Sequence, residues 1–287
     1  MKLASLTFRQ QTRIGVLSED GRSIGLFDEV HSDMTALIES GQNLHMLTAY
    51  AEPVPIDDVT LLAPIPRPRR NIICVGKNYR DHAREFARSG FEAGAVQGKD
   101  IDDYPALFTK LPDCVIGAND TIELHAGVTS KVDYEAELAV VVGRGGRGIS
   151  RSEAYGHVFG YTILNDITAR DLQKNHKQWF LGKSLDTFAP MGPYLVSADE
   201  LDQENLEVRC HVNGQLRQDA STRDLIFDIP TLIATISAGT TLRPGDIIAT
   251  GTPAGVGIGH EPPVFLQAGD RIEISISGIG TLTNTCA

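Results

Sequence analysis

The sequence predicts a β-rich α+β fold in which a small N-terminal domain precedes a larger one. Short runs of alternating or β-branched residues recur along its 287 residues, whereas helical periodicity appears only in short stretches. The runs are not spaced like repeated β-α-β units, which argues against a doubly wound sheet. The Pro-rich stretch PIPRPRR (64–70) fits neither a helix interior nor a central strand, so the boundary is placed there, between 1–66 and 67–287.

The N-terminal part is expected to contain a β-hairpin and one short helix. Two stretches of alternating polarity flank Glu19-Asp20-Gly21, and an Asp-Gly pair in that position is typical of a tight hairpin. Ser32 can then cap a helix over residues 33–38, because its hydroxyl can accept a backbone N–H of the first turn.

The larger part is expected to begin with a buried strand, a helix and a long loop. The β-branched run IICVG (72–76) predicts the strand, and residues 78–88 predict the helix, with Asn78 as its cap. Residues 89–104 show no periodicity and are rich in Gly and Asp. Loops of that length in compact enzymes are often lids or specificity elements, and this loop is expected to be one or the other.

Strands are expected to dominate the remainder of the chain. The patterns predict strands at 137–142, 158–165, 193–196, 206–212, 246–249 and 271–277. Helices are expected only at 151–157, 169–176 and 229–238. This excess of strands supports the β-rich class.

Composition and charge exclude several classes of protein. A net charge of −11 argues against a nucleic-acid partner, because an acidic protein repels phosphate backbones. Apolar runs fall short of the ~20 residues that a membrane-spanning helix needs, so we expect no membrane partner. Four scattered cysteines form no CxxC pair, which argues against a zinc site or a disulfide scaffold and fits a reducing compartment. We therefore expect a cytoplasmic protein.

Three acids stand where two predicted strands begin or end. Glu135 and Glu137 are two residues apart at the entry to the strand ELAVVV, so their side chains point to the same face. Asp166 directly follows the run YTILN. Three carboxylates without a nearby His or Cys favour Mg²⁺ or Mn²⁺, with Ca²⁺ also suitable, over zinc. The alternative is an acidic strand end exposed to solvent.

A histidine and a lysine are further candidates for chemistry. His82 and Glu85 are three residues apart on a predicted helix, and a carboxylate beside an imidazole raises its basicity toward water. The alternative is an ordinary surface pair. Lys183 lies in an apolar stretch broken by Gly and Pro, where partial burial would let it stabilise an oxyanion. Among the other histidines, His176 is the one expected to line a pocket.

The Gly-rich stretch ATGTPAGVG (249–257) follows a predicted strand. Its backbone amides and the hydroxyls of Thr250 and Thr252 could bind a carboxylate, the alternative being a plain turn. The run GRGGRG (143–148) lacks the helix start and the downstream acid of a dinucleotide-binding loop, and it is interpreted as a turn.

In chain order, these motifs resemble those of the fumarylacetoacetate hydrolase family. The motifs are CVGKNYRDHAREF, FTKLPDCVIG, DYEAELAVVVG, NDITARDLQ, KQWFLGKSLDTFAPMGP and ATGTPAGVG, spread over roughly residues 60–280. The resemblance implies a mixed β-roll or sandwich with a small N-terminal domain, usually assembled as a homodimer.

The resemblance also implies roles for individual residues. The family's metal ligands match Glu135, Glu137 and Asp166, and these would bind Mg²⁺ or Mn²⁺. Its water-activating pair matches His82 and Glu85, and its site lysine matches Lys183. Positions that contact substrate in the family match Gln173, Thr252 and Arg170. Residues 89–104 offer no match from which a substrate could be named.

The activity implied first is hydrolysis of a C–C bond in a 2,4-dioxo acid, an acylpyruvate such as fumarylpyruvate or acetylpyruvate, to pyruvate and a carboxylic acid. His82, polarised by Glu85, would activate water, and Lys183 would stabilise the oxyanion. The nearest alternative is an oxaloacetate decarboxylase or tautomerase, or a hydroxy-dienedioate isomerase or decarboxylase. A small 2-oxo acid is the substrate in each case. The remote alternative is a non-catalytic protein stabilised by a metal ion.

Overall fold

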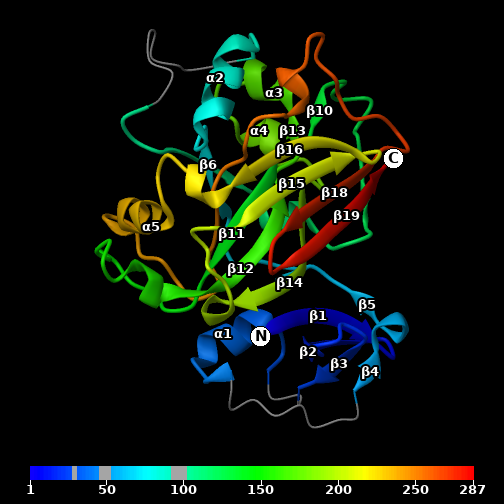
Figure 1. Ribbon diagram of the computed structural model, residues 1–287, viewed down its shortest axis with the longest axis vertical. Coiled ribbons are helices and arrows are strands. Elements are labelled where there is room, and N and C mark those ends of the chain that lie inside the picture. The colour runs from blue at the N-terminus through cyan, green and yellow to red at the C-terminus, as the bar shows by residue number, and fades with distance from the viewer. Residues whose placement is uncertain (28–30, 45–52, 92–101) are drawn as a thin grey trace.

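Strands dominate the computed structural model, which describes residues 1–27, 31–44, 53–91 and 102–287 (Figure 1). Among these residues the largest sheet has twelve strands. In order across the sheet they are β4 (Val54–Pro55), β3 (Ser23–Leu26), β2 (Gln11–Leu17), β1 (Lys2–Phe8), β14 (Ala189–Ser197), β12 (Val158–Asn165), β11 (Ala136–Val142), β17 (Ile247–Ala249), β6 (Ile72–Gly76) and β7 (Ala106–Lys110), with β5 (Thr60–Leu61) beside β1 and β8 (Val115–Ile116) beside β14. The predicted β-rich α+β class is confirmed.

A second sheet packs on the first. Its five strands are β16 (Gln215–Ser221), β15 (Glu207–Val212), β18 (Arg271–Ile276), β19 (Gly280–Cys286) and β9 (Thr121–Ile122). β15 packs against β11, β18 against β12 and β19 against β14. All seven residues of β11 are buried, as expected for a strand covered on both faces, whereas β18 alternates between buried and partly exposed positions. A two-stranded ribbon pairs β10 (Val132–Asp133) with β13 (Thr168–Ala169).

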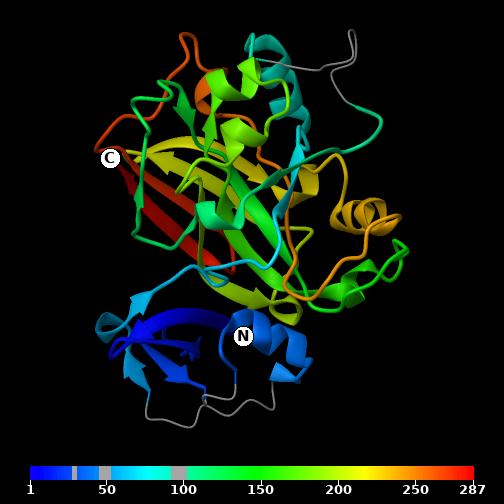
Figure 2. The same cartoon turned by 180° about the vertical axis from the view of Figure 1, so that it is seen from behind.

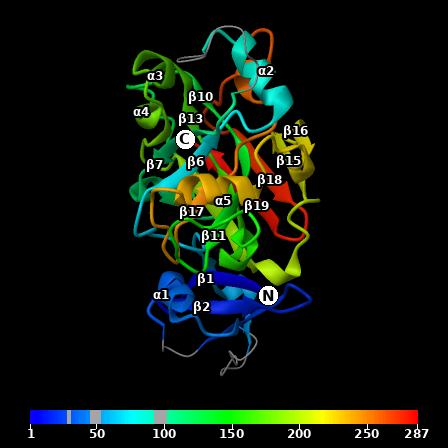
Figure 3. The ribbon, with the colours of Figure 1, turned by 90° about the vertical axis from the view of Figure 1, so that its left-hand side faces the viewer.

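The helices are short and gather mainly at one end. They are α1 (Met34–Ser40), α2 (Arg80–Arg88), α3 (Arg170–Asn175), α4 (Phe180–Lys183) and α5 (Ile229–Ser237), with 3-10 helices η2 (Ile56–Asp58), η3 (Pro112–Cys114), η4 (Ala154–His157), η5 (Ala198–Glu200), η6 (Thr222–Asp224) and η7 (Gly257–Gly259). In the view from behind and in the view turned by 90°, α2, α3 and α4 lie toward the end opposite the N-terminal strands (Figures 2 and 3). In the described part of the chain, no helix has the length and apolar character needed to cross a membrane.

The N-terminal strands β1 to β4 form one end of the twelve-stranded sheet but have a separate apolar core. They hold a small apolar cluster of their own around Leu6 and Ile24. However, β1 also pairs antiparallel with β14, with Lys2 opposite Val196. The division between 1–66 and 67–287 stays a prediction.

Several predicted elements agree with the structure, and two predicted helix caps are wrong. The expected hairpin is formed by β2 and β3. Helix α1 is capped by Asp33, whose Oδ1 accepts the N–H of Ala36 at 2.8 Å, and not by Ser32. Asn78 caps no helix, because its side chain donates to the carbonyls of Thr250 and Phe227 and so fixes the turn before α2.

Other predictions need different bounds. Only Ala154–His157 of the predicted helix 151–157 is helical, as one 3-10 turn. The predicted strand 193–196 begins earlier, at Ala189, and Pro193 lies within a register irregularity of its ladder with β12. Of the strands with five or more residues, β7, β16 and β19 were not predicted, and β16 and β19 are rich in polar residues. Helix α4 lies outside the three ranges in which helices were expected, so that expectation is wrong. Most of the predicted long loop 89–104 lies outside the described residues.

Candidate metal centre and active site

The three predicted metal ligands lie together at the ends of two paired strands. Glu135 precedes β11, Glu137 lies in β11, and Asp166 follows β12. Ala136 pairs with Asn165, and the N–H of Asp166 donates to the carbonyl of Glu135 at 2.9 Å. One carboxylate oxygen from each acid lies within 4.8 Å of the other two. All three acids are buried, so they do not form a solvent-exposed strand end.

Two buried lysines hold part of this carboxylate cluster. Lys183 Nζ lies 2.7 Å from both Glu135 Oε2 and Asp166 Oδ2. Lys110 Nζ lies 2.7 Å from Asp166 Oδ1 and also donates to the carbonyl of Ile167. Each lysine is at most 2% exposed. Their charges offset the cost of burying Glu135 and Asp166 without water.

Arg170 completes the network from helix α3. Its Nη1 lies 2.7 Å from Glu135 Oε1, and its Nε donates to Asp133 Oδ2 at 2.9 Å. The Oε1 of Gln173 accepts a further hydrogen bond from Nη1. Burial lowers the pKa of Arg170, but Asp133 and Glu135 outweigh it and raise that pKa. Nη2 is buried and has no partner among the described residues.

The acids of the cluster differ in their electrostatic surroundings. Burial raises the pKa of Glu135, but the charges of Lys183 and Arg170 outweigh it and lower that pKa to about 2. For Glu137, burial and the nearby Asp166 and Glu135 raise the pKa well above its usual value. Among the described residues, no ion pair joins Glu137 to a lysine or arginine.

A divalent cation fits this arrangement. Three hard carboxylate oxygens converge, as Mg²⁺, Mn²⁺ and Ca²⁺ require. Because burial, Asp166 and Glu135 raise the pKa of Glu137, a bound cation would favour the ionised form of this carboxylate. The residues that could hold a metal ion are therefore Glu135, Glu137 and Asp166.

His82, which is buried, and Glu85, which is half-buried, form a pair on one face of α2. His82 Nδ1 lies 3.0 Å from Glu85 Oε2. The side chain of His82 is 4% exposed and that of Glu85 15%, so this is not an ordinary surface pair. Because Nδ1 faces the carboxylate, Nε2 is the ring nitrogen that can exchange a proton with a ligand.

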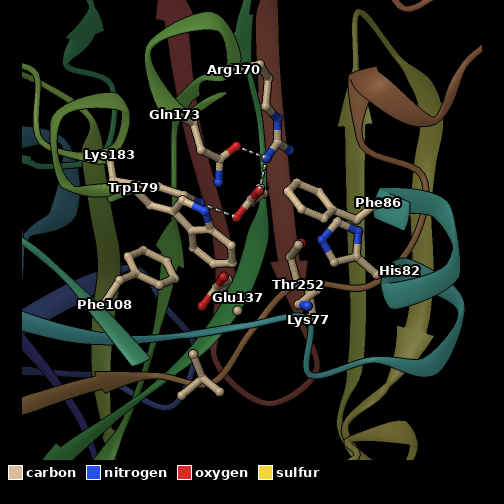
Figure 4. Close-up of a pocket in the computed structure, with 13 residues that line it drawn as sticks. Lys77, His82, Phe86, Phe108, Glu137, Arg170, Gln173, Trp179, Lys183 and Thr252 are labelled. Carbon is tan, nitrogen blue, oxygen red and sulfur yellow. Dashed lines mark hydrogen bonds and ion pairs between the residues drawn. The ribbon is translucent and has the colours of Figure 1, made fainter. Parts of the chain in front are cut away.

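One cavity brings most of the predicted site residues together (Figure 4). Its polar walls come from Lys77, His82, Glu135, Glu137, Arg170, Gln173, Lys183 and Thr252, and its apolar walls include Phe86, Phe108 and Trp179. Glu85 lies behind His82 and does not line this cavity. His176 is exposed at the end of α3, so the expectation that it lines the pocket is wrong.

The Gly-rich loop after β17 does bind carboxylates, and these are the chain's own. The N–H of Gly251 donates to Glu137 Oε2 at 2.9 Å. The N–H of Gly255 donates to Glu85 Oε1 at 2.9 Å. Farther along, the amides of Gly257 and Ile258 donate to Asp133. A single loop therefore orients a candidate metal ligand and the carboxylate behind His82.

Sequence reasoning missed two charged residues of the site. Lys110 compensates Asp166, and Asp133 holds Arg170 in place. Both are in motifs already noted, FTK and DYEAE. For Lys110 the available signal was its spacing from Phe108, because residues two apart on a strand point to the same face.

Known proteins share the sequence and the fold over most of the chain. A family model described as fumarylacetoacetate (FAA) hydrolase C-terminal matches residues 71–287. Oxaloacetate tautomerase YisK of Bacillus subtilis is 58% identical over 230 residues, which are 80% of this chain and 73% of that protein.

Solved structures also match along the whole chain, including those of two hydrolases. The fumarylacetoacetate hydrolase of Exiguobacterium antarcticum has a TM-score of 0.84 and 43% identity, with 100% of this chain and 99% of that chain covered. The maleylpyruvate hydrolase of Sphingobium sp. SYK-6, solved with manganese(II) and pyruvate, has a TM-score of 0.77 and 32% identity, with the same coverage.

Proposed function

Because the chain belongs to the fumarylacetoacetate hydrolase family, and is thus an enzyme of that family, we propose that it is a metal-dependent oxaloacetate tautomerase. The observation that carries the proposal is the 58% identity to a protein with that name over 80% of this chain. This supports the alternative named from the sequence better than C–C bond hydrolysis, the activity expected first. The substrate would be a small 2-oxo acid that exchanges between keto and enol forms.

The proposed cofactor is Mg²⁺ or Mn²⁺, held by Glu135, Glu137 and Asp166. When bound, such an ion would act as a Lewis acid on the substrate's 2-oxo and carboxylate oxygens and make the adjacent C–H more acidic. Manganese in the maleylpyruvate hydrolase structure supports this kind of ion. The choice between the two ions belongs to the same proposal.

His82 would exchange the proton that interconverts the two forms. Enolisation removes a proton from C3 of oxaloacetate and places one on the oxygen at C2. His82 lines the cavity, and with Nδ1 bonded to Glu85 its Nε2 can take the proton from C3 and deliver it to the oxygen at C2, or carry it from that oxygen to C3 in the reverse direction. The carboxylate of Glu85 favours the cationic ring that forms between these steps.

Four other residues would orient the substrate and stabilise its charge. Lys183 is a buried cation at the cavity wall, so it can donate to the oxygen on which negative charge develops. Arg170 and Gln173 line the same cavity, and the buried Nη2 of Arg170 can donate to a substrate carboxylate. Thr252 contributes a hydroxyl that accepts a hydrogen bond from Gln218 at 2.8 Å. Homodimer assembly and a cytoplasmic location stay predictions.

C–C bond hydrolysis of an acylpyruvate is the second candidate. The His82–Glu85 pair beside the cavity favours it, because such a pair can equally activate a water molecule. Similarity to the maleylpyruvate hydrolase gives further support.

A substrate panel separates the two activities. Metal-free protein would be tested with Mg²⁺, Mn²⁺ or EDTA on enol-oxaloacetate, acetylpyruvate, fumarylpyruvate and a hydroxylated dienedioate. Faster decay of the enol absorbance without pyruvate release supports the tautomerase. Pyruvate release from an acylpyruvate that is faster than the decay of enol-oxaloacetate supports the hydrolase. If no compound shows metal-dependent turnover, both activities are contradicted.

A further inference from the structure

The carboxylate of Glu85 is held from two sides. Its Oε2 lies 3.0 Å from Nδ1 of His82, and its Oε1 accepts the N–H of Gly255 at 2.9 Å. The second contact joins α2 to the Gly-rich loop, 170 residues away along the chain. The direction of the carboxylate toward His82 therefore depends on how closely this loop approaches α2.

Gly259 lies directly against the same carboxylate. A Cβ at this position would stand 1.7 Å from Oε1 of Glu85 and 2.3 Å from its Cδ. Both distances are far shorter than any real contact between such atoms. Gly259 does not adopt a positive φ, so its backbone conformation is open to other residues. The reason for glycine here is the space that Glu85 occupies.

The other glycines of the loop are constrained differently. At Gly255, which has a φ of 101°, a Cβ would stand 1.8 Å from the backbone oxygen of Arg217. At Gly257 it would stand 2.1 Å from the backbone oxygen of Val264. Side chains at these two positions would force the backbone to move. At Gly259 the obstructing atoms are instead the end of a flexible side chain, so Glu85 itself would move.

Packing keeps the backbone fixed on both sides of this contact. Phe86 of α2 forms an apolar cluster with Val256, which directly precedes η7, and with Ile258, which lies in η7. Because this cluster is buried and does not involve Glu85, it can hold α2 against η7 when the Glu85 side chain turns away.

We propose that Gly259 is a positioning residue for the His82–Glu85 pair. By presenting no side chain, it leaves the space in which the Glu85 carboxylate faces His82. This inference rests on the proposed function, in which His82 exchanges a proton with the substrate. A side chain at position 259 separates the carboxylate from the ring without disturbing the metal ligands.

The test is Gly259→Ala, with Gly239→Ala as the matched control. Gly239 also lacks a positive φ, and a Cβ there would meet nothing within 4 Å. For Gly259→Ala we expect kcat to fall about 100-fold, since a displacement of ~1 Å can cost that much. The KM, the Mn²⁺ affinity of the protein and its melting temperature should stay at wild-type values. Gly239→Ala should match wild type throughout.

A double variant tests whether the effect passes through Glu85. In a Glu85→Gln background, Gly259→Ala should cause no further loss of kcat, because the positioned carboxylate is already absent. Fold-losses that multiply would show that Gly259 acts by another route and would overturn the proposal. A Gly259→Ala protein with full activity, or with a lowered melting temperature that accounts for its loss, would overturn it as well.

A spectroscopic measurement separates this inference from the proposed function. A hydrogen bond from His82 Nδ1–H to a carboxylate gives a downfield proton resonance, which should be present in wild type and Gly239→Ala and absent in Gly259→Ala. Wild-type protein that turns over no 2-oxo acid would contradict the proposed function, yet loss of this resonance would still support the role of Gly259. An unchanged resonance in Gly259→Ala would contradict that role, even in an active enzyme.

Discussion

Glu135 and Glu137 of the carboxylate cluster and His82 of the His82–Glu85 pair line the same cavity, but the two groups are attached to the protein in different ways (Figure 4). The cluster grows out of β11 and β12 in the middle of the twelve-stranded sheet, and buried cations bond directly to Glu135 and Asp166. The pair lies on the short helix α2, and Glu85 is fixed by two hydrogen bonds. The candidate metal centre is thus part of the core, whereas the pair proposed to exchange protons is attached to the edge of that core.

This difference separates two kinds of mutational effect. Removing one charge from a buried network leaves its partner unpaired in a place without water, which lowers stability. Removing a group held at the edge of the cavity changes the chemistry and leaves the core intact. Within one active site, stability and activity should therefore respond to different residues.

The largest effect is expected when the metal site loses a ligand. Glu137→Gln, or chelation by EDTA, should lower turnover by at least about 10³-fold, because a metal supplies several kcal/mol of charge stabilisation. Glu137 has no lysine or arginine partner among the described residues, so the metal-free variant should melt at or above the wild-type temperature. Enzyme assays, Mn²⁺ titration and thermal melting measure these quantities. Turnover that survives both changes would exclude a metal role.

The next largest effect tests whether the carboxylate cluster and its buried lysines contribute to the stability of the fold. Lys110 is fully buried and pairs with Asp166, so Lys110→Met should lower the free energy of unfolding by about 3–5 kcal/mol. Urea denaturation of the metal-free protein measures it. A loss below ~1 kcal/mol would mean that Lys183 alone compensates Asp166.

A smaller effect, on activity alone, is expected at the pair on α2. His82→Asn should lower the tautomerisation rate about 100-fold, as is typical when a general base is removed. Mn²⁺ affinity and melting temperature should not change, since His82 bonds to Glu85 and not to the metal ligands. His176→Asn, an exposed histidine outside the cavity, is the control. Equal losses in both variants, or weakened Mn²⁺ binding, would contradict the separation of the two regions.

The same division decides what the sequence could predict. Glu135 and Glu137 were recognised because residues two apart on a strand share a face, and His82 and Glu85 because residues three apart share a helix face. These are local relations that spacing alone contains. The chain order of the motifs then identified the family.

Contacts between distant segments could not be predicted in this way. Lys110 reaches Asp166 across 56 residues, and Gly259 meets Glu85 only because a loop returns to α2. The wrong cap at Asn78 has the same origin, since a tertiary contact with Thr250 uses its side chain. In each case the partner depends on the sheet order, which no local pattern encodes.

The smallest effect is expected at an ion pair whose nitrogen–oxygen distances resemble those of the buried pairs but whose side chains are exposed. Arg151 lies 2.8 and 3.1 Å from the two carboxylate oxygens of Asp228, and both side chains are at least half exposed. Arg151→Ala should lower the free energy of unfolding by less than about 1 kcal/mol, because water screens the pair. Asp228→Ala should cost more, typically ~1 kcal/mol, since Asp228 also caps α5 through the N–H of Thr231. If Arg151→Ala cost as much as Lys110→Met, pairing rather than burial would explain the stability of the metal centre, and its treatment as part of the core would be wrong.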